Sequence, residues 1–378
     1  MVAARHHPGM ARTAPTLDHL RTYALARSLF KPTTLPQALK RLGFVQADPI
    51  RAPARAQDLT LRHRVKDYAA GDLERRYTRL DIDEDFFVNY GFLSRETQAL
   101  MHPRTPNTVW PKARWAQANA VLDFVRERGV VHPREVDAAF AHGTAKNWFG
   151  GNSKASTQLL DGLHYRGLLR TARREGGIRL YEVRTPPPTA TATNPDPDTV
   201  ARAQDRLVDV VLQKYAPLPE LSLNELVRRV RYGAPQWTPH MNTVLARTKA
   251  RLPNATVDGT RWFWPEGENP ASQRHQLDDA VRLLAPFDPV VWDRRRFERF
   301  WGWAYRFEAY TPAPKRLRGY YALPLLWRGQ VIGWGNIGVK DGALQPDLGY
   351  VSGQAPREGA YRTALDEELS RMHTFLGL

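Results

Sequence analysis

The chain has 378 residues, of which 42% are hydrophobic and 25% charged, a composition typical of soluble globular proteins. It contains no cysteine and no run of about 18 apolar residues, which excludes disulfides, thiolate metal sites and cysteine nucleophiles and predicts no membrane-spanning helix. Fifty-five Lys and Arg against 39 Asp and Glu give a net charge of +16, which favours a polyanionic partner, most often nucleic acid.

The N-terminal part predicts a leader and a first helical unit. Residues 1–15 are basic and lack the apolar core of a secretory signal, so we expect a short disordered leader. In 16–110, the segments LRTYALARSLF, LPQALKRL and ARAQDLTLRHRV predict three helices, with VQADPI (45–50) before the third. We interpret this unit as a first, looser winged helix.

VQADPI itself has two interpretations. In an extended segment, the side chains of Gln46 and Asp48 project from the same face, because side chains alternate along a strand. The pair is then a candidate for catalysis, whereas an Asp-Pro turn that closes a helical segment is the alternative.

Residues 111–185 predict a clearer winged helix. A helix over 113–128 stops at Gly129, and HPREVDAAFA and SKASTQLLDGLHYRG predict two more. LLRTARR and IRLYEV then form a hairpin around EGG (175–177). Three helices and a hairpin are the layout of a winged helix. Residues 186–200, rich in Pro and Thr, predict an extended linker.

The same layout recurs before a different C-terminal part. Residues 201–280 predict a third winged helix, with helices over 201–215, 222–230 and 238–252 and a hairpin around Asp258-Gly259. In 281–378, alternating segments separated by Arg328-Gly329 and Asp341-Gly342 predict a β-barrel or β-meander, and a helix ends the chain. The predicted fold class is therefore α+β, with tandem winged helices followed by a C-terminal β-barrel or meander.

Two motif matches fail on their context. Gly333, Gly335 and Gly338 match the dinucleotide-binding pattern, but the following residues predict a hairpin and not the helix that this site needs. The acidic run 81–85 is similar to the start of an EF-hand loop but has Phe86 where the turn needs glycine, so we interpret it as a solvated acidic loop. No P-loop or metal-ligand spacing is present, and we expect no metal and no cofactor.

A family resemblance rests on two stretches. PFDP (286–289), WDR (292–294), PAPKR (312–316) and GYY (319–321) resemble the signature of the AlkZ/YcaQ family of bacterial alkylpurine DNA glycosylases. Gln46-Ala47-Asp48 is similar to the family's catalytic motif in its Gln-apolar-Asp, YcaQ-like form. The segment 86–96 lacks the Trp and His of the family's aromatic stretch, and the resemblance is weak between 195 and 280.

The resemblance implies a monofunctional DNA glycosylase, a hydrolase of the N-glycosidic bond of N7-alkylated purines, including bulky adducts or interstrand crosslinks. It implies that Gln46 and Asp48 are catalytic, and that the chain acts as a monomer on double-stranded DNA in the bacterial cytoplasm, without a membrane or small-molecule cofactor. A non-catalytic winged-helix protein, either a regulator or a lesion binder, is the alternative.

Basic residues flank the candidate site and the proposed wing and recognition helix, where phosphate contacts supply affinity. Each of them has the alternative of an ordinary solvated surface charge. The candidate DNA-binding residues are Arg51, Arg55, Arg62, Arg64, Lys154, Arg173, Arg174, Lys315 and Arg316.

Overall fold

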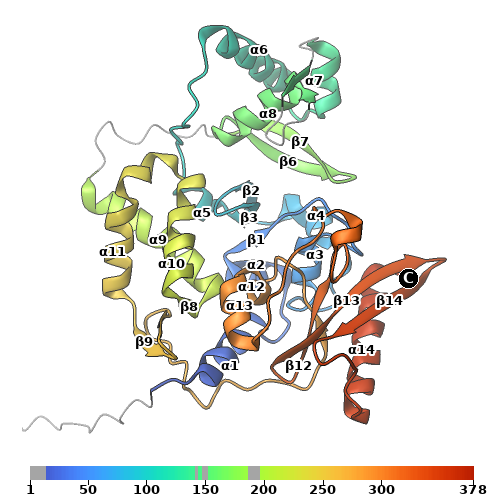
Figure 1. Cartoon of the computed structure of the whole chain (residues 1–378). Helices are drawn as coiled ribbons and strands as arrows, with labels where there is room; N and C mark the ends of the chain where they lie inside the picture. The colour runs from blue at the N-terminus through green and yellow to red at the C-terminus, as the bar shows by residue number, and fades with distance from the viewer. Residues whose placement is uncertain (1–13, 141–143, 147–151, 186–195) are drawn as a thin grey trace, which may run out of the picture.

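The computed structural model describes residues 14–140, 144–146, 152–185 and 196–378 (Figure 1). The expected leader lies outside these residues except for its last two positions. The expected linker lies outside them as far as residue 195, and a helix begins soon afterwards at Pro197. No helix in the described ranges is both long and apolar enough to cross a membrane.

The N-terminal part folds around a three-stranded antiparallel sheet of order β1-β3-β2. Apolar residues at helical spacing explain the second helix, whose Leu35, Ala38, Leu39 and Leu42 are all buried. The elements are α1 (Leu17–Ser28), α2 (Leu35–Leu42), β1 (Phe44–Gln46), α3 (Ala56–Leu61), α4 (Asp72–Arg76), β2 (Ile82–Phe86), β3 (Tyr90–Ser94) and α5 (Arg95–Ala99).

Strand β1 lies between two cores. Val45 packs in a core that this N-terminal part shares with the C-terminal sheet, whereas Phe44 packs in a second core with the helices that follow residue 196. Alternation along the strand directs Gln46 to the same side as Phe44. The central position of β1 therefore brings residues from distant parts of the chain around the VQADPI segment.

The next part, which we call the α6–β7 lobe (residues 112–183), has its own apolar core. Its helices and its last hairpin follow the predicted order, and an additional short hairpin, β4–β5, precedes the third helix. Whether this lobe is a winged helix stays a prediction. The elements are α6 (Lys112–Arg128), α7 (Pro133–Ala139), β4 (Thr144–Lys146), β5 (Asn152–Lys154), α8 (Ala155–Tyr165), β6 (Leu169–Glu175) and β7 (Ile178–Val183).

Residues 197–263 form a helical layer against the β1–β3 sheet (Figure 1). The helix predicted to begin at Ser222 begins two residues earlier, at Glu220, and Ser222 is buried inside it. The elements are α9 (Pro197–Tyr215), β8 (Leu218–Pro219), α10 (Glu220–Arg229), α11 (Met241–Arg251), β9 (Asn254–Val257) and β10 (Thr260–Phe263).

The C-terminal part contains a four-stranded antiparallel sheet of order β11-β12-β13-β14, with α14 packed beside it. The meander is confirmed, but the closed barrel is wrong: within 281–378, all of which are described, β11 and β14 are edges that do not pair. The elements are β11 (Arg282–Leu283), α12 (Pro289–Trp292), α13 (Arg294–Trp301), β12 (Leu323–Trp327), β13 (Gln330–Lys340), β14 (Ala343–Tyr350) and α14 (Gly359–Leu376).

The acidic run 81–85 is not the solvated loop that we expected. Asp83, Glu84 and Asp85 lie in β2 and are each 1% exposed. The reason is that arginines neutralise them, and two of these, Arg170 and Arg174, come from the α6–β7 lobe. The ion pairs are Arg170 and Arg184 with Asp83, Arg174 with Glu84, and Arg104 with Asp85.

Candidate active site

Gln46 ends strand β1 with its side-chain amide held in one orientation. Its Oε1 accepts hydrogen bonds from Nε1 of Trp292 (3.0 Å) and from Nδ2 of Asn89 (3.2 Å). An indole nitrogen only donates, so the amide atom that faces it is the oxygen. The amide NH2 group makes no hydrogen bond with the described residues, and it remains free to donate to a ligand.

Asp48 follows in the loop after β1 and is half-buried. Its Oδ1 accepts the backbone N–H of Ile50 (2.9 Å), and its own N–H donates to Oε1 of Gln57 (3.4 Å). No Lys, Arg or His of the described ranges forms an ion pair with its carboxylate. Burial raises the pKa of Asp48. The hydrogen bond from Ile50 lowers it, but by less, so the pKa stays above its usual value.

The C-terminal signature folds over this loop. Tyr321 and Phe307 pack in the same core as Ala47, and their rings meet edge to face at 5.3 Å. Beyond burial, the main influence on the pKa of Tyr321 is the negative charge of Asp48, which raises it. Residues more than 250 positions apart in the sequence therefore surround one carboxylate.

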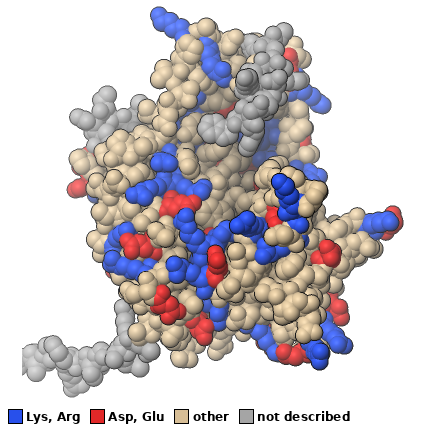
Figure 2. Space-filling view, viewed as in Figure 1, with Lys and Arg blue, Asp and Glu red and all other residues tan. Residues whose placement is uncertain are grey.

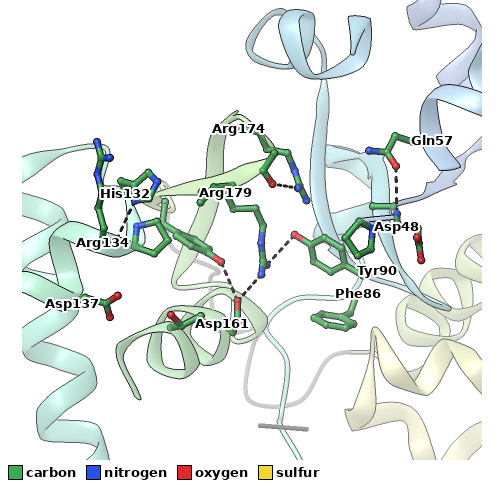
Figure 3. A pocket seen from close by; sticks show the side chains of 17 residues that line it. Asp48, Gln57, Phe86, Tyr90, His132, Arg134, Asp137, Asp161, Arg174 and Arg179 are labelled. Atoms are coloured by element: carbon green, nitrogen blue, oxygen red, sulfur yellow. Dashed lines mark hydrogen bonds and ion pairs between the residues drawn. The ribbon is translucent and has the colours of Figure 1, made fainter. Parts of the chain in front are cut away.

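A cleft of about 600 Å³ opens between Asp48 and the α6–β7 lobe (Figures 2 and 3). Asp48, Phe86 and Tyr90 lie on one side of it, and α7 and α8 form the other. Between the two sides, the guanidinium of Arg179 donates hydrogen bonds to the carboxylate of Asp161 (2.7 Å) and to the hydroxyl of Tyr90 (3.2 Å). The segment 86–96, where the family's aromatic stretch is altered, thus contributes two rings to the cleft.

The tip of the β6–β7 hairpin lies against the loop that follows Asp48. Arg51 donates to the carbonyl oxygen of Gly176 (3.5 Å), and the guanidinium of Arg55 packs on Gly177. A Cβ atom at Gly177, where φ is +90°, would lie 1.6 Å from Nη2 of Arg55. Glycine permits this approach, because it has no Cβ atom and adopts this positive φ readily.

Four of the nine candidate DNA-binding residues are held inside the protein. The side chains of Arg62 and Arg64 are at most 3% exposed and pair with Glu368 and Asp288. Arg55 and Arg174 are little exposed and pair with Glu74 and Glu84. The ion pairs of these guanidinium groups hold the fold together, and of the four residues Arg174 also lines the cleft.

The other candidates differ in what they present. Arg51, Arg173 and Lys315 are exposed, and Arg316 is partly buried, with Nε donating to the carbonyl oxygen of Thr311 (2.8 Å). Lys154 ends β5, but its side chain lies outside the described part of the structure.

Sequence reasoning missed a second basic region. Arg228, Arg229, Arg231 and Arg295 line a shallow depression of about 400 Å³ on α10 and α13, with Glu225 as the acidic side chain among them. The guanidinium of Arg229 lies 5.4 Å from the ring of Trp292, the residue that holds Gln46. Arg228 and Arg229 are adjacent at the end of α10. Two arginines at the end of a helix do not by themselves indicate that the helix lies near Gln46.

Comparison with known proteins defines the class. The model of a family described as "DNA glycosylase AlkZ-like" matches residues 39–375 of this chain. The chain belongs to this AlkZ-like DNA glycosylase family. Its fold is similar to that of the Streptomyces sahachiroi DNA glycosylase AlkZ, with a TM-score of 0.61 and 15% sequence identity over 97% of this chain and 98% of that one.

Proposed function

We propose that this DNA glycosylase is monofunctional and hydrolyses the N-glycosidic bond of N7-alkylated purines in double-stranded DNA, with Asp48 and Gln46 as its catalytic residues. The observation that carries the proposal is the unpaired carboxylate of Asp48. Its neighbours Glu84 and Asp161 are bonded to Arg174 and Arg179. An unpaired carboxylate in a cleft is free to act on a ligand.

The chemistry of the substrate fits a single carboxylate. An N7-alkylated purine is cationic, so it leaves with the electron pair of the bond to C1′ and becomes neutral without a general acid. The sugar acquires oxocarbenium character, which a nearby carboxylate stabilises electrostatically. Water then bonds to C1′ and transfers a proton to Asp48, for which a raised pKa is favourable.

Gln46 supports this step as a hydrogen-bond donor. Because Trp292 and Asn89 occupy its Oε1, the amide offers its NH2 group to the attacking water or to a phosphate oxygen. The geometry therefore favours positioning by donation, and an acceptor role for this side chain is disfavoured.

The DNA backbone is proposed to follow the exposed basic side chains on both sides of Asp48. The exposed basic side chain on the α6–β7 lobe is Arg173, and the one on the C-terminal part is Lys315. On the helical layer, the depression around Arg231 extends the path. One chain supplies all of these groups, which is consistent with action as a monomer.

The cleft beside Asp48 supports activity on bulky adducts. With a volume of about 600 Å³ and contact with solvent, it has space for a substituent that extends beyond the purine ring. Interstrand crosslinks are the extreme case, since the base stays tethered to the other strand and a closed base pocket would not accept it.

The test is base release from methylated duplex DNA. Asp48→Asn keeps the size of the side chain but removes its charge, and we expect the release of 7-methylguanine to fall at least 100-fold while DNA affinity changes less than about threefold. Asp258→Asn, in the exposed β9–β10 turn, is the matched control and should behave like the wild type.

Strand breaks at abasic sites after alkali treatment report the reaction. Equal release by the wild type and Asp48→Asn would refute the role of this carboxylate. Lesion-selective binding by the wild type without any strand breaks would instead support the alternative of a lesion binder.

A further inference from the structure

Helix α3 is a fixed support next to the loop that carries Asp48. All six residues of the helix are buried. Near its end, the carbonyl oxygen of Thr60 accepts a hydrogen bond from Arg64 (2.6 Å), and Arg64 pairs with Asp288 of the C-terminal part (2.7 Å). The helix is therefore held by two parts of the fold at once, and a side chain that projects from it has a defined position.

Gln57 is the residue of α3 that reaches the candidate site (Figure 3). It is 1% exposed and yet lines the cleft beside Asp48. Its Oε1 accepts the backbone N–H of Asp48 (3.4 Å). The preceding N–H, that of Ala47, still donates to the carbonyl oxygen of Tyr90 in β3 (3.0 Å), and Pro49 has no N–H to donate. Gln57 thus holds the backbone at the point where the chain leaves the sheet.

The amide of Gln57 also leaves a donor free. A backbone N–H can only donate, so the amide atom that faces Asp48 is the oxygen, and the NH2 group points elsewhere. This NH2 group makes no hydrogen bond with the described residues. Polar groups on nearly buried side chains normally have a partner, because an unbonded donor is unfavourable. Since Gln57 lines the cleft, the missing partner is expected to be a water or a ligand bound there.

Gln46 and Gln57 share one arrangement next to Asp48. Trp292 holds the oxygen of Gln46, the N–H of Asp48 holds the oxygen of Gln57, and each amide keeps its NH2 group for a ligand. A lysine or arginine in either position would form an ion pair with Asp48 and lower its pKa. A neutral amide donates hydrogen bonds and leaves the carboxylate able to accept a proton.

We propose that Gln57 is a further functional residue of this site: its oxygen fixes the backbone of Asp48, and its NH2 group donates a hydrogen bond to the water that attacks C1′. The inference rests on the proposed function and adds the group that positions the nucleophile. The water bonds to C1′ with one lone pair, accepts the hydrogen bond from Gln57 with the other and transfers one proton to Asp48. The purine leaves with the electron pair of its bond to C1′. Holding the water in this geometry lowers the entropic cost of the attack.

The first test removes both hydrogen bonds while it keeps a side chain of similar size. Gln57→Met should lower single-turnover release of 7-methylguanine from duplex DNA at least tenfold, roughly the effect of one hydrogen bond made in the transition state. DNA affinity should change less than about threefold. Gln204→Met is the matched control, because Gln204 is 4% exposed and accepts a hydrogen bond from Arg247 (3.1 Å) away from the cleft. The control should release the base at the wild-type rate, and melting temperatures compare the stability of the two variants.

The second test separates the two roles of the amide. Gln57→Glu keeps an oxygen for the N–H of Asp48 but replaces the NH2 group with a second oxygen. At about pH 8, where carboxylates are ionised, it should remain at least tenfold slower than the wild type.

The pH–rate profile of the same variant tests the position of residue 57. A second carboxylate beside Asp48 raises its pKa, so the acid limb of the profile should move to higher pH in Gln57→Glu and stay near its wild-type position in Gln57→Met. The other ionisable side chains near Asp48 or along the cleft are the same in both variants: Tyr90, Arg174, Arg179, Tyr310 and Tyr321.

The outcomes distinguish this inference from the proposed function. A wild-type rate in Gln57→Met, or in Gln57→Glu at about pH 8, would overturn the inference and leave the proposed function intact. An acid limb that does not move in Gln57→Glu would overturn it as well. If Gln57→Met is much less stable than Gln204→Met, the rate and profile of Gln57→Glu decide. Failure of the wild type to release any base would overturn the proposed function and this inference with it.

Discussion

At the scale of single residues, the candidate site depends on which groups are bonded and which are free. Trp292 and Asn89 hold Gln46 by its oxygen, and the carboxylate of Asp48 has no cationic partner among the described residues. Of the two, only the amide has its orientation set by a residue from the C-terminal signature. Trp292, the first residue of the WDR segment that resembles the family signature, thus orients a residue of the candidate site.

This role predicts the effect of Trp292→Phe. The variant removes the Nε1–H donor but keeps an aromatic ring, so the amide of Gln46 is less restrained. We expect base release to fall roughly fivefold to tenfold, the equivalent of about 1 kcal/mol for one hydrogen bond, with little change in DNA affinity.

Trp301→Phe provides the matched control. It removes an equivalent bond from an indole to a carbonyl oxygen, that of Gly329 (3.0 Å), away from the site. Single-turnover rates of the two variants should differ although their losses of stability are similar. Equal rates would contradict the positioning role of Trp292.

At the scale of elements, the turns predicted from local sequence are confirmed, whereas the burial of the acidic strand β2 was not predicted. The turns predicted around residues 175–177, 258–259, 328–329 and 341–342 all connect antiparallel strands, and their central residues have positive φ as this turn type requires. The acidic strand β2 was missed because carboxylates normally favour solvent. Arginines more than 85 residues away make its burial possible.

The ion pair of Glu84 and Arg174 therefore holds the α6–β7 lobe on the sheet. Burial by itself raises the pKa of Glu84, but the hydrogen bonds and charge of Arg174 outweigh it and lower the pKa. Glu84→Gln leaves Arg174 without its charge partner, and we expect the free energy of unfolding to fall by about 3 kcal/mol in urea denaturation.

Glu182→Gln is the control for that experiment. Its partner is Arg170, and the pair is more exposed than that of Glu84, so its removal should cost less than about 1 kcal/mol. A loss in Glu84→Gln as small as that of the control would show that the lobe does not depend on the buried pair.

At the scale of the whole molecule, three distant segments meet around Asp48. Residues 44–61 supply Gln46 and Asp48, the α6–β7 lobe forms the opposite wall, and residues 287–321 cover the loop after β1. Figure 2 shows Lys and Arg side chains along the hollow between the lobe and the body.

Salt dependence of DNA binding tests this path. Replacing one phosphate-contacting side chain should weaken binding uniformly across sequences and reduce the slope of log K against log salt by about 1. We expect this of Arg173→Ala, Lys315→Ala and Arg231→Ala. Arg126→Ala, an exposed arginine of α6 paired with Asp123, should leave the slope unchanged. Equal slopes for all four variants would place the DNA elsewhere.

The sequence by itself determined the elements that depend on local chemistry. Periodic apolar residues specified most helices, and turn residues specified the four hairpins. The spacing of Gln46 and Asp48, together with the resemblance of residues 283–333, indicated the family and the candidate catalytic pair.

Only the tertiary structure decided which charges are free, because an ion pair joins residues that the sequence separates. Arg62, Arg64 and Arg174 are basic in the sequence, but Glu368, Asp288 and Glu84 neutralise them in the fold. Asp48 is acidic in the sequence like any other aspartate, and only the fold leaves it half-buried at a cleft with no ion pair to a described cation.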